Sequence, residues 1–148
     1  MTTEPVVVVE GLSKRFGDVV AVRSVNFSVP ARSTTALLGG NGAGKTTTLS
    51  ILLGLILPTT GRVAVFGEDM ARHRYRVLPR MNFSSPYVDL PKRLTARENL
   101  TVYARLYGLR GAARRVRDIA RDLDMGAFLG RPTGTLSAGQ MTRLALAK

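Results

Sequence analysis

The sequence predicts an α/β fold, and three observations along its 148 residues support this. β-branched and alternating apolar residues fill the first 30 positions, a pattern typical of strands. A glycine-rich loop follows, between an apolar run and a helical stretch. The second half then shows two amphipathic helical patterns and a third helix start. This order is expected of an α/β architecture that carries a helical insertion.

The first part of the chain is predicted to form antiparallel strands. Val6–Val9 is a continuous β-branched run, and apolar and polar residues alternate from 20 to 29. A turn around Gly17 joins the two. Thr34–Leu38 predicts a short buried strand that runs into the glycine-rich loop. The remaining predicted elements of this part are a helix over Thr46–Leu57 stopped by Pro58, a strand over Gly61–Phe66, a short helix over Arg72–Leu78 and a strand over Met81–Phe83.

The second part is predicted to be helical after a loop over Ser84–Lys92. Thr95 and Glu98 form a capping box at the start of the first helix. A second amphipathic helix is expected from about Ala112 to Met125. After a loop at 131–135, Ser137 is expected to cap a last helix that continues to Lys148.

Composition excludes several classes of function. The chain has no cysteine and one histidine, so disulfides and thiolate metal sites are excluded. The net charge of +12 suits phosphate-rich partners or anionic membrane surfaces. The arginines are spread along the chain without interleaved aromatic residues, which disfavours nucleic acid. We interpret the densest group, between Arg110 and Arg121, as a solvated helix face. With no signal peptide and no apolar run of ~20 residues, a cytoplasmic location is expected.

The glycine-rich loop has the pattern of a phosphate-binding P-loop. Its residues are Gly39, Gly40, Asn41, Gly42, Ala43, Gly44, Lys45 and Thr46, followed by Thr47 in the helix. Glycines let consecutive N–H groups point at phosphate oxygens, and the helix start adds a positive dipole end. Lys45 is expected to reach the β and γ phosphates, and the Thr46 hydroxyl to ligate Mg²⁺. The loop does not follow the dinucleotide-binding fingerprint.

A second motif narrows the choice among nucleotide-binding proteins. Leu136-Ser137-Ala138-Gly139-Gln140 differs only at Ala138 from the Leu-Ser-Gly-Gly-Gln signature of the ATP-binding-cassette family. With the P-loop, it makes the chain closely resemble that family, in particular bacterial cassettes that serve exporters of drugs, lipids or polysaccharides.

The resemblance implies an incomplete P-loop NTPase core with an antiparallel β-subdomain and a helical subdomain. The corresponding parts are residues 1–33 for the β-subdomain, 34–83 for the core, 84–135 for the coupling loop and helical subdomain, and 136–148 for the signature helix. It implies a head-to-tail dimer in which the signature contacts, in trans, the ATP held by the other subunit. Phe16 falls where the family stacks an aromatic ring on adenine. Leu94–Leu100 matches the segment that opens the helical subdomain.

Three departures from the family qualify this resemblance. Gly40 replaces a proline, which leaves the loop less pre-organised. Ser84 replaces the glutamine that touches Mg²⁺ and the attacking water. The sequence ends at Lys148, before the family's Asp-Glu strand and switch histidine; the similar pattern Val6–Glu10 lies on the wrong side of the P-loop. This chain alone is therefore expected to bind ATP weakly, to hydrolyse little or none, to expose apolar edges and to aggregate.

The resemblance implies an ATPase subunit that binds ATP and Mg²⁺ and drives a transmembrane permease. Such a subunit is peripheral on the inner face of the cell membrane, does not bind nucleic acid, and leaves no trace of the cargo in its sequence. Two alternatives are a regulatory nucleotide-binding module that does not hydrolyse ATP and a nucleic-acid-associated cassette.

Overall fold

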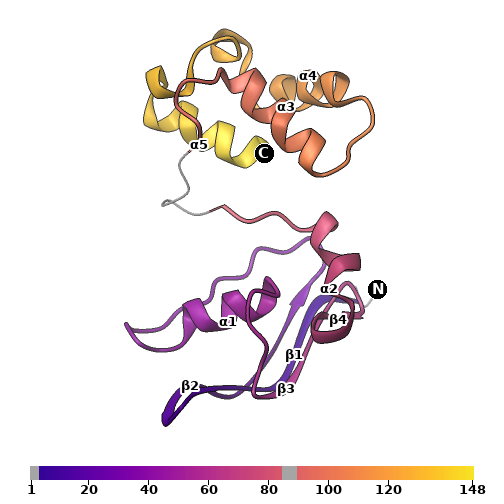
Figure 1. The fold of residues 1–148 in the computed structure, drawn as a ribbon, viewed down its shortest axis with the longest axis vertical. Helices are drawn as coiled ribbons and strands as arrows, with labels where there is room; N and C mark the ends of the chain where they lie inside the picture. Colours follow the sequence, from indigo (N-terminus) through magenta and orange to yellow (C-terminus); the bar gives the residue numbers. More distant parts are fainter. Residues whose placement is uncertain (1–3, 85–89) are drawn as a thin grey trace. The chain divides into compact units, whose positions relative to one another are not determined.

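A four-stranded antiparallel sheet is the centre of the first part of the chain (Figure 1). The computed structural model describes residues 4–84 and 90–148. The strand order is β2-β1-β3-β4. The strands are β1 (Pro5–Phe16), β2 (Val19–Pro30), β3 (Thr60–Val65) and β4 (Glu68–Asp69). The predicted strands at the start of the chain and at Gly61–Phe66 are therefore confirmed, with β1 and β2 longer than the sequence suggested.

Strands β1 and β2 form a long hairpin, and its turn lies at Gly17 as predicted. Phe16 pairs with Val19 across a connection of two residues, and Gly17 has a φ of 56°. On the other edge of β1, Gly61 of β3 lies against the backbone of Gly11. A Cβ on Gly61 would stand 2.4 Å from the Gly11 carbonyl oxygen, so only glycine fits there.

Two helices pack against this sheet through one hydrophobic core. The helices are α1 (Lys45–Leu52) and α2 (Met70–Val77), the latter followed by a short 3₁₀ turn at Leu78–Arg80. The buried core consists of Val9, Leu12, Val22, Ile51, Val63, Val65, Met70 and Val77. The Asp69 carboxylate caps α2 by accepting hydrogen bonds from the N–H groups of Ala71 and Arg72.

Two predicted strands of this part are not formed. Thr34–Leu38 has no regular secondary structure, and 41% of Leu37 and 87% of Leu38 are exposed. Met81–Phe83 is also irregular. A strand is stable only when a neighbour satisfies its ladder hydrogen bonds. The described sheet, formed only by β1 to β4, provides no neighbour for either segment.

The helix predicted at Thr46–Leu57 is shorter than expected and ends at Leu52. Gly54 follows with a φ of 67°, and the N–H of Leu53 still bonds to the Leu49 carbonyl. A glycine with positive φ is the usual helix terminator, so Gly54 ends this helix before Pro58 can.

The second part of the chain is a helical unit with its own core. Residues separate into two compact units, Met1–Met81 and Asn82–Lys148. The second unit contains α3 (Ala96–Leu106), α4 (Ala112–Asp122) and α5 (Ala138–Ala147), with 3₁₀ turns at Gly126–Phe128 and Thr133–Thr135. Its buried core consists of Leu90, Ala96, Leu100, Ala104, Val116, Ala120, Met125, Phe128, Leu129 and Leu144. The predicted helices are confirmed, although α4 ends before Met125.

The capping box predicted at the start of α3 is present. The Glu98 N–H donates to Thr95 Oγ1 at 3.2 Å, and the Thr95 N–H donates to Glu98 Oε2 at 2.7 Å. The bonds from the Thr95 backbone and hydroxyl to the carboxylate lower the pKa of Glu98 below its ordinary value of 4.5.

The lowered pKa predicts how acid destabilises the helical unit. A carboxylate whose pKa is lower in the folded state contributes stability above its unfolded pKa, and this contribution is lost as pH falls through the folded pKa. We expect Glu98→Gln to flatten the decline of the urea midpoint as pH falls below 4.5, because the variant has no titrating carboxylate at the start of α3. An unaltered pH profile for Glu98→Gln would contradict this assignment.

Buried Asn99 ties α3 to the loop that precedes it. The side chain is 2% exposed, and its Nδ2 donates to the carbonyl oxygens of Pro91, Leu94 and Thr95 at 3.1–3.4 Å. Thr133 reinforces this loop, because its Oγ1 donates to the Pro91 carbonyl at 2.7 Å. The start of α3 and the segment before the signature are thus held as one structure.

Replacement of Asn99 is predicted to loosen this structure. Asn99→Ala removes a buried donor and leaves a cavity, so we expect the free energy of unfolding to fall by about 1–3 kcal/mol. Thr101→Ala on the same helix removes only a bond from an exposed hydroxyl to the Arg97 carbonyl and should change stability by less than about 0.5 kcal/mol. Urea denaturation followed by circular dichroism measures both; equal values would contradict the role of Asn99.

Candidate functional site

The glycine-rich loop leads directly into α1 and surrounds a hollow of roughly 340 Å³. Gly42 and Gly44 have φ values of 80° and 81°, which place both in the left-handed region. Within the loop, the Ala43 N–H donates to the Gly40 carbonyl at 3.2 Å. The hollow is lined by Ala21, Asn41, Gly42, Ala43, Gly44, Lys45, Thr46 and Thr47. All but Ala21 were predicted from the sequence to bind nucleotide.

Close packing against β2 fixes the end of the loop. A Cβ on Gly44 would stand 2.3 Å from the Ala21 carbonyl oxygen and 3.0 Å from Cγ2 of Val22. Gly44 therefore has two reasons to be glycine, its positive φ and this contact. No pattern in the sequence indicates the part played by Ala21, because its contribution is a backbone atom brought close by the fold.

The side chain of Lys45 folds back over the loop. Its ammonium group donates to the carbonyl oxygens of Gly39 at 2.6 Å and Gly40 at 2.7 Å. Among the residues that the structure describes, no carboxylate forms an ion pair with it. An uncompensated cation therefore lies beside the hollow, which attracts anions.

Helix α1 begins without a side-chain cap. Asp69, Thr95 and Ser137 cap α2, α3 and α5, whereas α1 begins at Gly44 with no capping hydrogen bond. The first N–H groups of a helix have no partner within it, so those of α1 are available as donors. Together with the helix dipole and Lys45, they fit a phosphate chain. The exposed Thr46 offers a hydroxyl of the kind that ligates Mg²⁺.

Phe16 lies at the end of β1 and is 50% exposed. The Lys14 ammonium lies 4.9 Å from the centre of its ring. A core phenylalanine would be buried, so this ring is placed as a surface that can stack on a base.

The signature residues form the start of α5. The Gln140 N–H donates to Ser137 Oγ at 3.3 Å, and the Ser137 N–H donates to Gln140 Oε1 at 2.9 Å. The Ser137 hydroxyl, which accepts here, can still donate its own hydrogen to an anion. Nothing lies within 4 Å of the Cβ position of Gly139, so the space beside it is open.

Sequence reasoning missed the structural role of Gln140. The residue was expected to contact nucleotide, and the structure shows its side chain holding the helix start. The pattern Ser137-x-x-Gln140 is itself a capping-box sequence and could have revealed this.

Residues 22–148 match the family model described as ABC transporter. The chain belongs to the ABC transporter family. The resemblance to the ATP-binding-cassette family is thereby confirmed. In the part of the chain that the structure describes, no helix is long and apolar enough to cross a membrane.

Curated relatives of this ABC transporter chain include ATP-binding proteins named for export and one named for import. It is 38% identical over 149 residues to the Nod factor export ATP-binding protein I of Ralstonia nicotianae, covering 97% of this chain and 46% of the relative. A "Probable multidrug ABC transporter ATP-binding protein" of Escherichia coli is 34% identical, with 97% and 25% covered. The sulfate/thiosulfate import ATP-binding protein of Mycolicibacterium paratuberculosis is 37% identical, with 91% and 38% covered. The chain thus spans less than half the length of these relatives.

Solved structures agree on the fold. The ATP-binding subunit of an ABC transporter superposes with a TM-score of 0.80 at 26% identity, covering 96% of this chain and 60% of that one. The predicted α/β architecture of a P-loop cassette is thereby confirmed.

Ser84 occupies the position at which the family has glutamine, and it lies outside any helix or strand. Its side chain is exposed, and residues 85–89 of the predicted loop Ser84–Lys92 lie outside the described residues. Ser84 and the signature belong to the second unit, whereas the P-loop belongs to the first.

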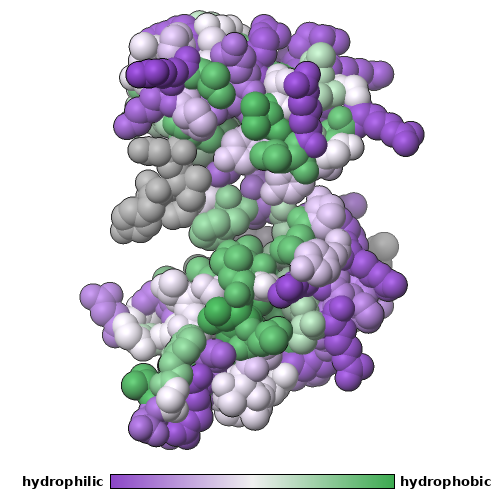
Figure 2. All heavy atoms as spheres, in the orientation of Figure 1, coloured by the Kyte–Doolittle hydropathy of each residue, from purple (hydrophilic) through white to green (hydrophobic). Residues whose placement is uncertain are grey.

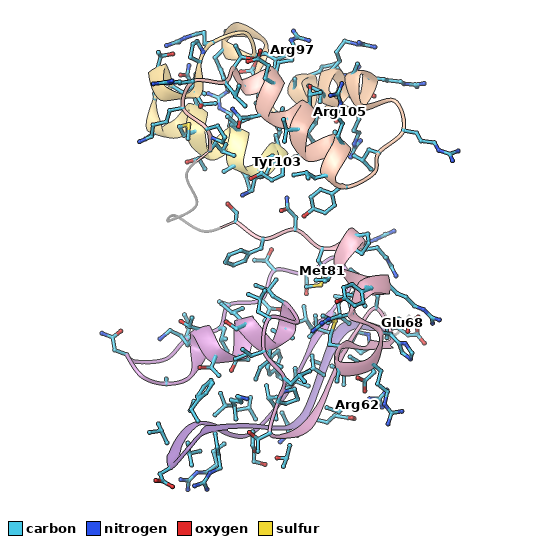
Figure 3. The ribbon with its side chains drawn as sticks, viewed as in Figure 1. Arg62, Glu68, Met81, Arg97, Tyr103 and Arg105 are labelled. Carbon is cyan, nitrogen blue, oxygen red and sulfur yellow. The ribbon has the colours of Figure 1, made fainter. Side chains whose placement is uncertain are left out.

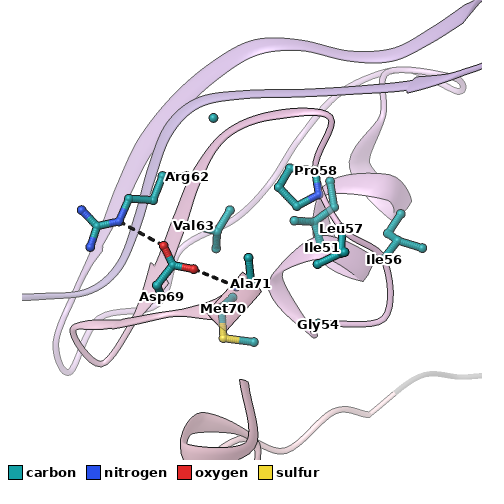
Figure 4. Close-up of a pocket in the computed structure, with 11 residues that line it drawn as sticks. Ile51, Gly54, Ile56, Leu57, Pro58, Arg62, Val63, Asp69, Met70 and Ala71 are labelled. Carbon is teal, nitrogen blue, oxygen red and sulfur yellow. Dashed lines mark hydrogen bonds and ion pairs between the residues drawn. The ribbon is translucent and has the colours of Figure 1, made fainter. Parts of the chain in front are cut away.

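A second, apolar pocket of roughly 160 Å³ lies between α1, β3 and α2 (Figure 4). Its lining is largely Ile51, Ile56, Leu57, Pro58, Val63 and Met70. At one side Arg62 Nε lies 3.4 Å from Asp69 Oδ2, the carboxylate that caps α2. The sequence did not predict this pocket, and none of the predicted site residues lines it.

Proposed function

We propose that this chain binds the phosphates of Mg-ATP in the hollow at 39–47, as the nucleotide-binding part of a transport ATPase. The observation that carries the proposal is the start of α1, which has no side-chain cap, beside a Lys45 ammonium that forms no ion pair with a described residue. The backbone donors and Lys45 would hold the phosphates, Thr46 would hold Mg²⁺, and Phe16 would stack on the base. Bound Mg²⁺ would supply charge neutralisation between the phosphates.

We further propose that two copies associate head to tail around ATP. Ser137 and Gly139 would then contact the nucleotide held by the other copy. The open space beside Gly139 and the free hydrogen of the Ser137 hydroxyl support this role. The N–H groups of Ala138 and Gly139, in the first turn of α5, would add donors.

Hydrolysis is proposed to require a carboxylate that the hollow does not contain. Its lining residues include none, and polarisation of an attacking water needs such a group. We therefore expect the purified 148-residue chain to bind ATP without steady turnover. Serine at position 84 would reach Mg²⁺ only through a bridging water. A steady turnover that Lys45→Ala abolishes would contradict this part of the proposal.

Export is the proposed direction of transport, with the chain peripheral on the inner face of the membrane through a permease. The Nod factor relative supports export, and its 38% identity exceeds, by a narrow margin, the 37% of the import protein. A drug, lipid or polysaccharide cargo is proposed from the resemblance to such exporters.

Mixing two variants tests the head-to-tail pair. Lys45→Ala disables the phosphate loop of one copy, and Gly139→Leu fills the open space beside the signature of the other. With ATP, each variant alone should remain monomeric in sedimentation equilibrium. A mixture should associate, because one site then has both an intact loop and an intact signature. No association in the mixture, or wild-type association by each single variant, would contradict the arrangement.

A further inference from the structure

The second half of α3 and its connection to α4 carry exposed apolar side chains. Val102, Leu106 and Leu109 are 46%, 74% and 46% exposed. Val102 and Leu106 are four residues apart on α3, so they share one face of the helix, and Arg105, three residues after Val102, lies at one side of that face. Figure 3 labels Arg105 on α3. The opposite side of α3 contributes buried Leu100 and Ala104 to the core, which leaves this face without a partner in the unit.

Exposed arginines adjoin these apolar residues in the chain. Arg105, Arg110, Arg115 and Arg117 are exposed, and none forms an ion pair with a described residue. In contrast, Arg114 and Arg121 approach Asp118 at 3.9 and 3.8 Å. Arg105 and Arg110 adjoin Leu106 and Leu109 in the chain, whereas Arg115 and Arg117 are about 200° apart around α4 and therefore lie on different sides of it. In Figure 2, hydrophilic side chains project from the α3–α4 side of this unit, with hydrophobic atoms between them.

Exposed Leu106 and Leu109, with the exposed arginines Arg105 and Arg110 next to them in the chain, have the chemistry of a surface that binds an anionic bilayer. Leucines enter the boundary between headgroups and acyl chains, and arginines contact the phosphates. Long arginine side chains can do so while their stems remain against apolar neighbours. Both features of the surface are then satisfied by a single partner.

Nucleic acid matches only one of these features. Binding to single strands uses aromatic rings as stacking platforms. The two tyrosines here are engaged elsewhere: the Tyr107 hydroxyl donates to Asn82 Oδ1 at 3.5 Å, and the Lys148 ammonium lies 5.3 Å from the centre of the Tyr103 ring. The leucines would remain exposed to water in such a complex.

We propose that the end of α3 and its connection to α4, through Leu106, Leu109 and the adjoining Arg105 and Arg110, bind directly to anionic phospholipid at the membrane surface. This contact is independent of the proposed nucleotide binding and needs no permease. It would hold the helical unit against the bilayer with the apolar residues inserted only to headgroup depth.

Co-sedimentation with lipid vesicles tests the proposal on the 148-residue chain without nucleotide. Vesicles are made of phosphatidylcholine, or of the same lipid with one third replaced by phosphatidylglycerol. The chain should bind only the anionic vesicles, more weakly as salt rises. Arg105→Gln with Arg110→Gln should lower the partition coefficient about 30-fold, at about fivefold per charge. Leu106→Ser with Leu109→Ser should lower it about tenfold because apolar insertion is lost.

Matched controls distinguish binding by this surface from binding that depends only on net charge or on exposed apolar residues elsewhere. Arg23→Gln with Arg72→Gln removes the same charge from exposed positions of the first unit, and Leu55→Ser with Leu57→Ser removes two exposed leucines there. Both controls should bind as the wild type does. Equal losses in the controls, equal binding to both vesicle types, or displacement of the chain from vesicles by single-stranded RNA with the same dependence on Arg105 and Arg110 would overturn the proposal.

Discussion

Replacing Lys45 with alanine is expected to weaken ATP binding by roughly 10- to 100-fold. The ammonium is the charged donor beside the hollow, and hydrogen bonds to charged groups contribute about 1.5–3 kcal/mol each. The change also removes the bonds to Gly39 and Gly40 that shape the empty loop. Titration of a fluorescent ATP analogue measures the affinity, and circular dichroism should show an unchanged fold.

Arg72→Ala is the matched control for the lysine. It removes one exposed cation from α2 in the same unit, and Arg72 does not line the hollow. Its affinity should remain within about twofold of the wild type. If Lys45→Ala retained wild-type affinity, or if both variants lost affinity equally, phosphate binding in this loop would be disproved.

Gly44→Ala is expected to cost both stability and ATP binding. The left-handed backbone alone costs about 1–2 kcal/mol for a residue with a Cβ. The new Cβ would also meet the Ala21 carbonyl oxygen at 2.3 Å, and relieving such overpacking costs about 1–3 kcal/mol more. The sheet or the loop must shift, so we expect a loss of about 2–5 kcal/mol in the free energy of unfolding, with ATP affinity below detection.

Gly42→Ala separates the two causes. Its φ of 80° nearly equals that of Gly44, but nothing lies within 4 Å of its Cβ position. Urea unfolding should therefore show only the backbone cost of about 1–2 kcal/mol. Indistinguishable losses for the two variants would mean that the contact with Ala21 does not position the loop.

Local patterns could be predicted from the sequence, and non-local ones could not. The Thr95–Glu98 cap, the turn at Gly17 and the glycine-rich loop before α1 depend on residues within a few positions of one another, and each is present. The strand predicted at Thr34–Leu38 depends on a partner strand, which no local pattern reports. It is irregular in the structure for that reason.

The candidate site shows the same division. Motif spacing identified the residues of the loop and of the signature. The bond from Lys45 to Gly39, the contact between Gly44 and β2, and the exposure of Phe16 are consequences of folding. The exposure of Val102 and Leu106 on α3 could not be predicted either, because periodicity shows which residues are apolar and not which of them are buried by another element.

The contact between Gly44 and β2 has a consequence for which ligands can be held. Val19 of β2 pairs with Phe16, and two residues further along the same strand Ala21 lies against Gly44. The ring and the phosphate loop are therefore fixed to one short stretch of backbone. If the base stacks on Phe16 and the phosphates bind at the start of α1, as proposed, the hairpin would set the distance that the sugar and the phosphate chain must span between them.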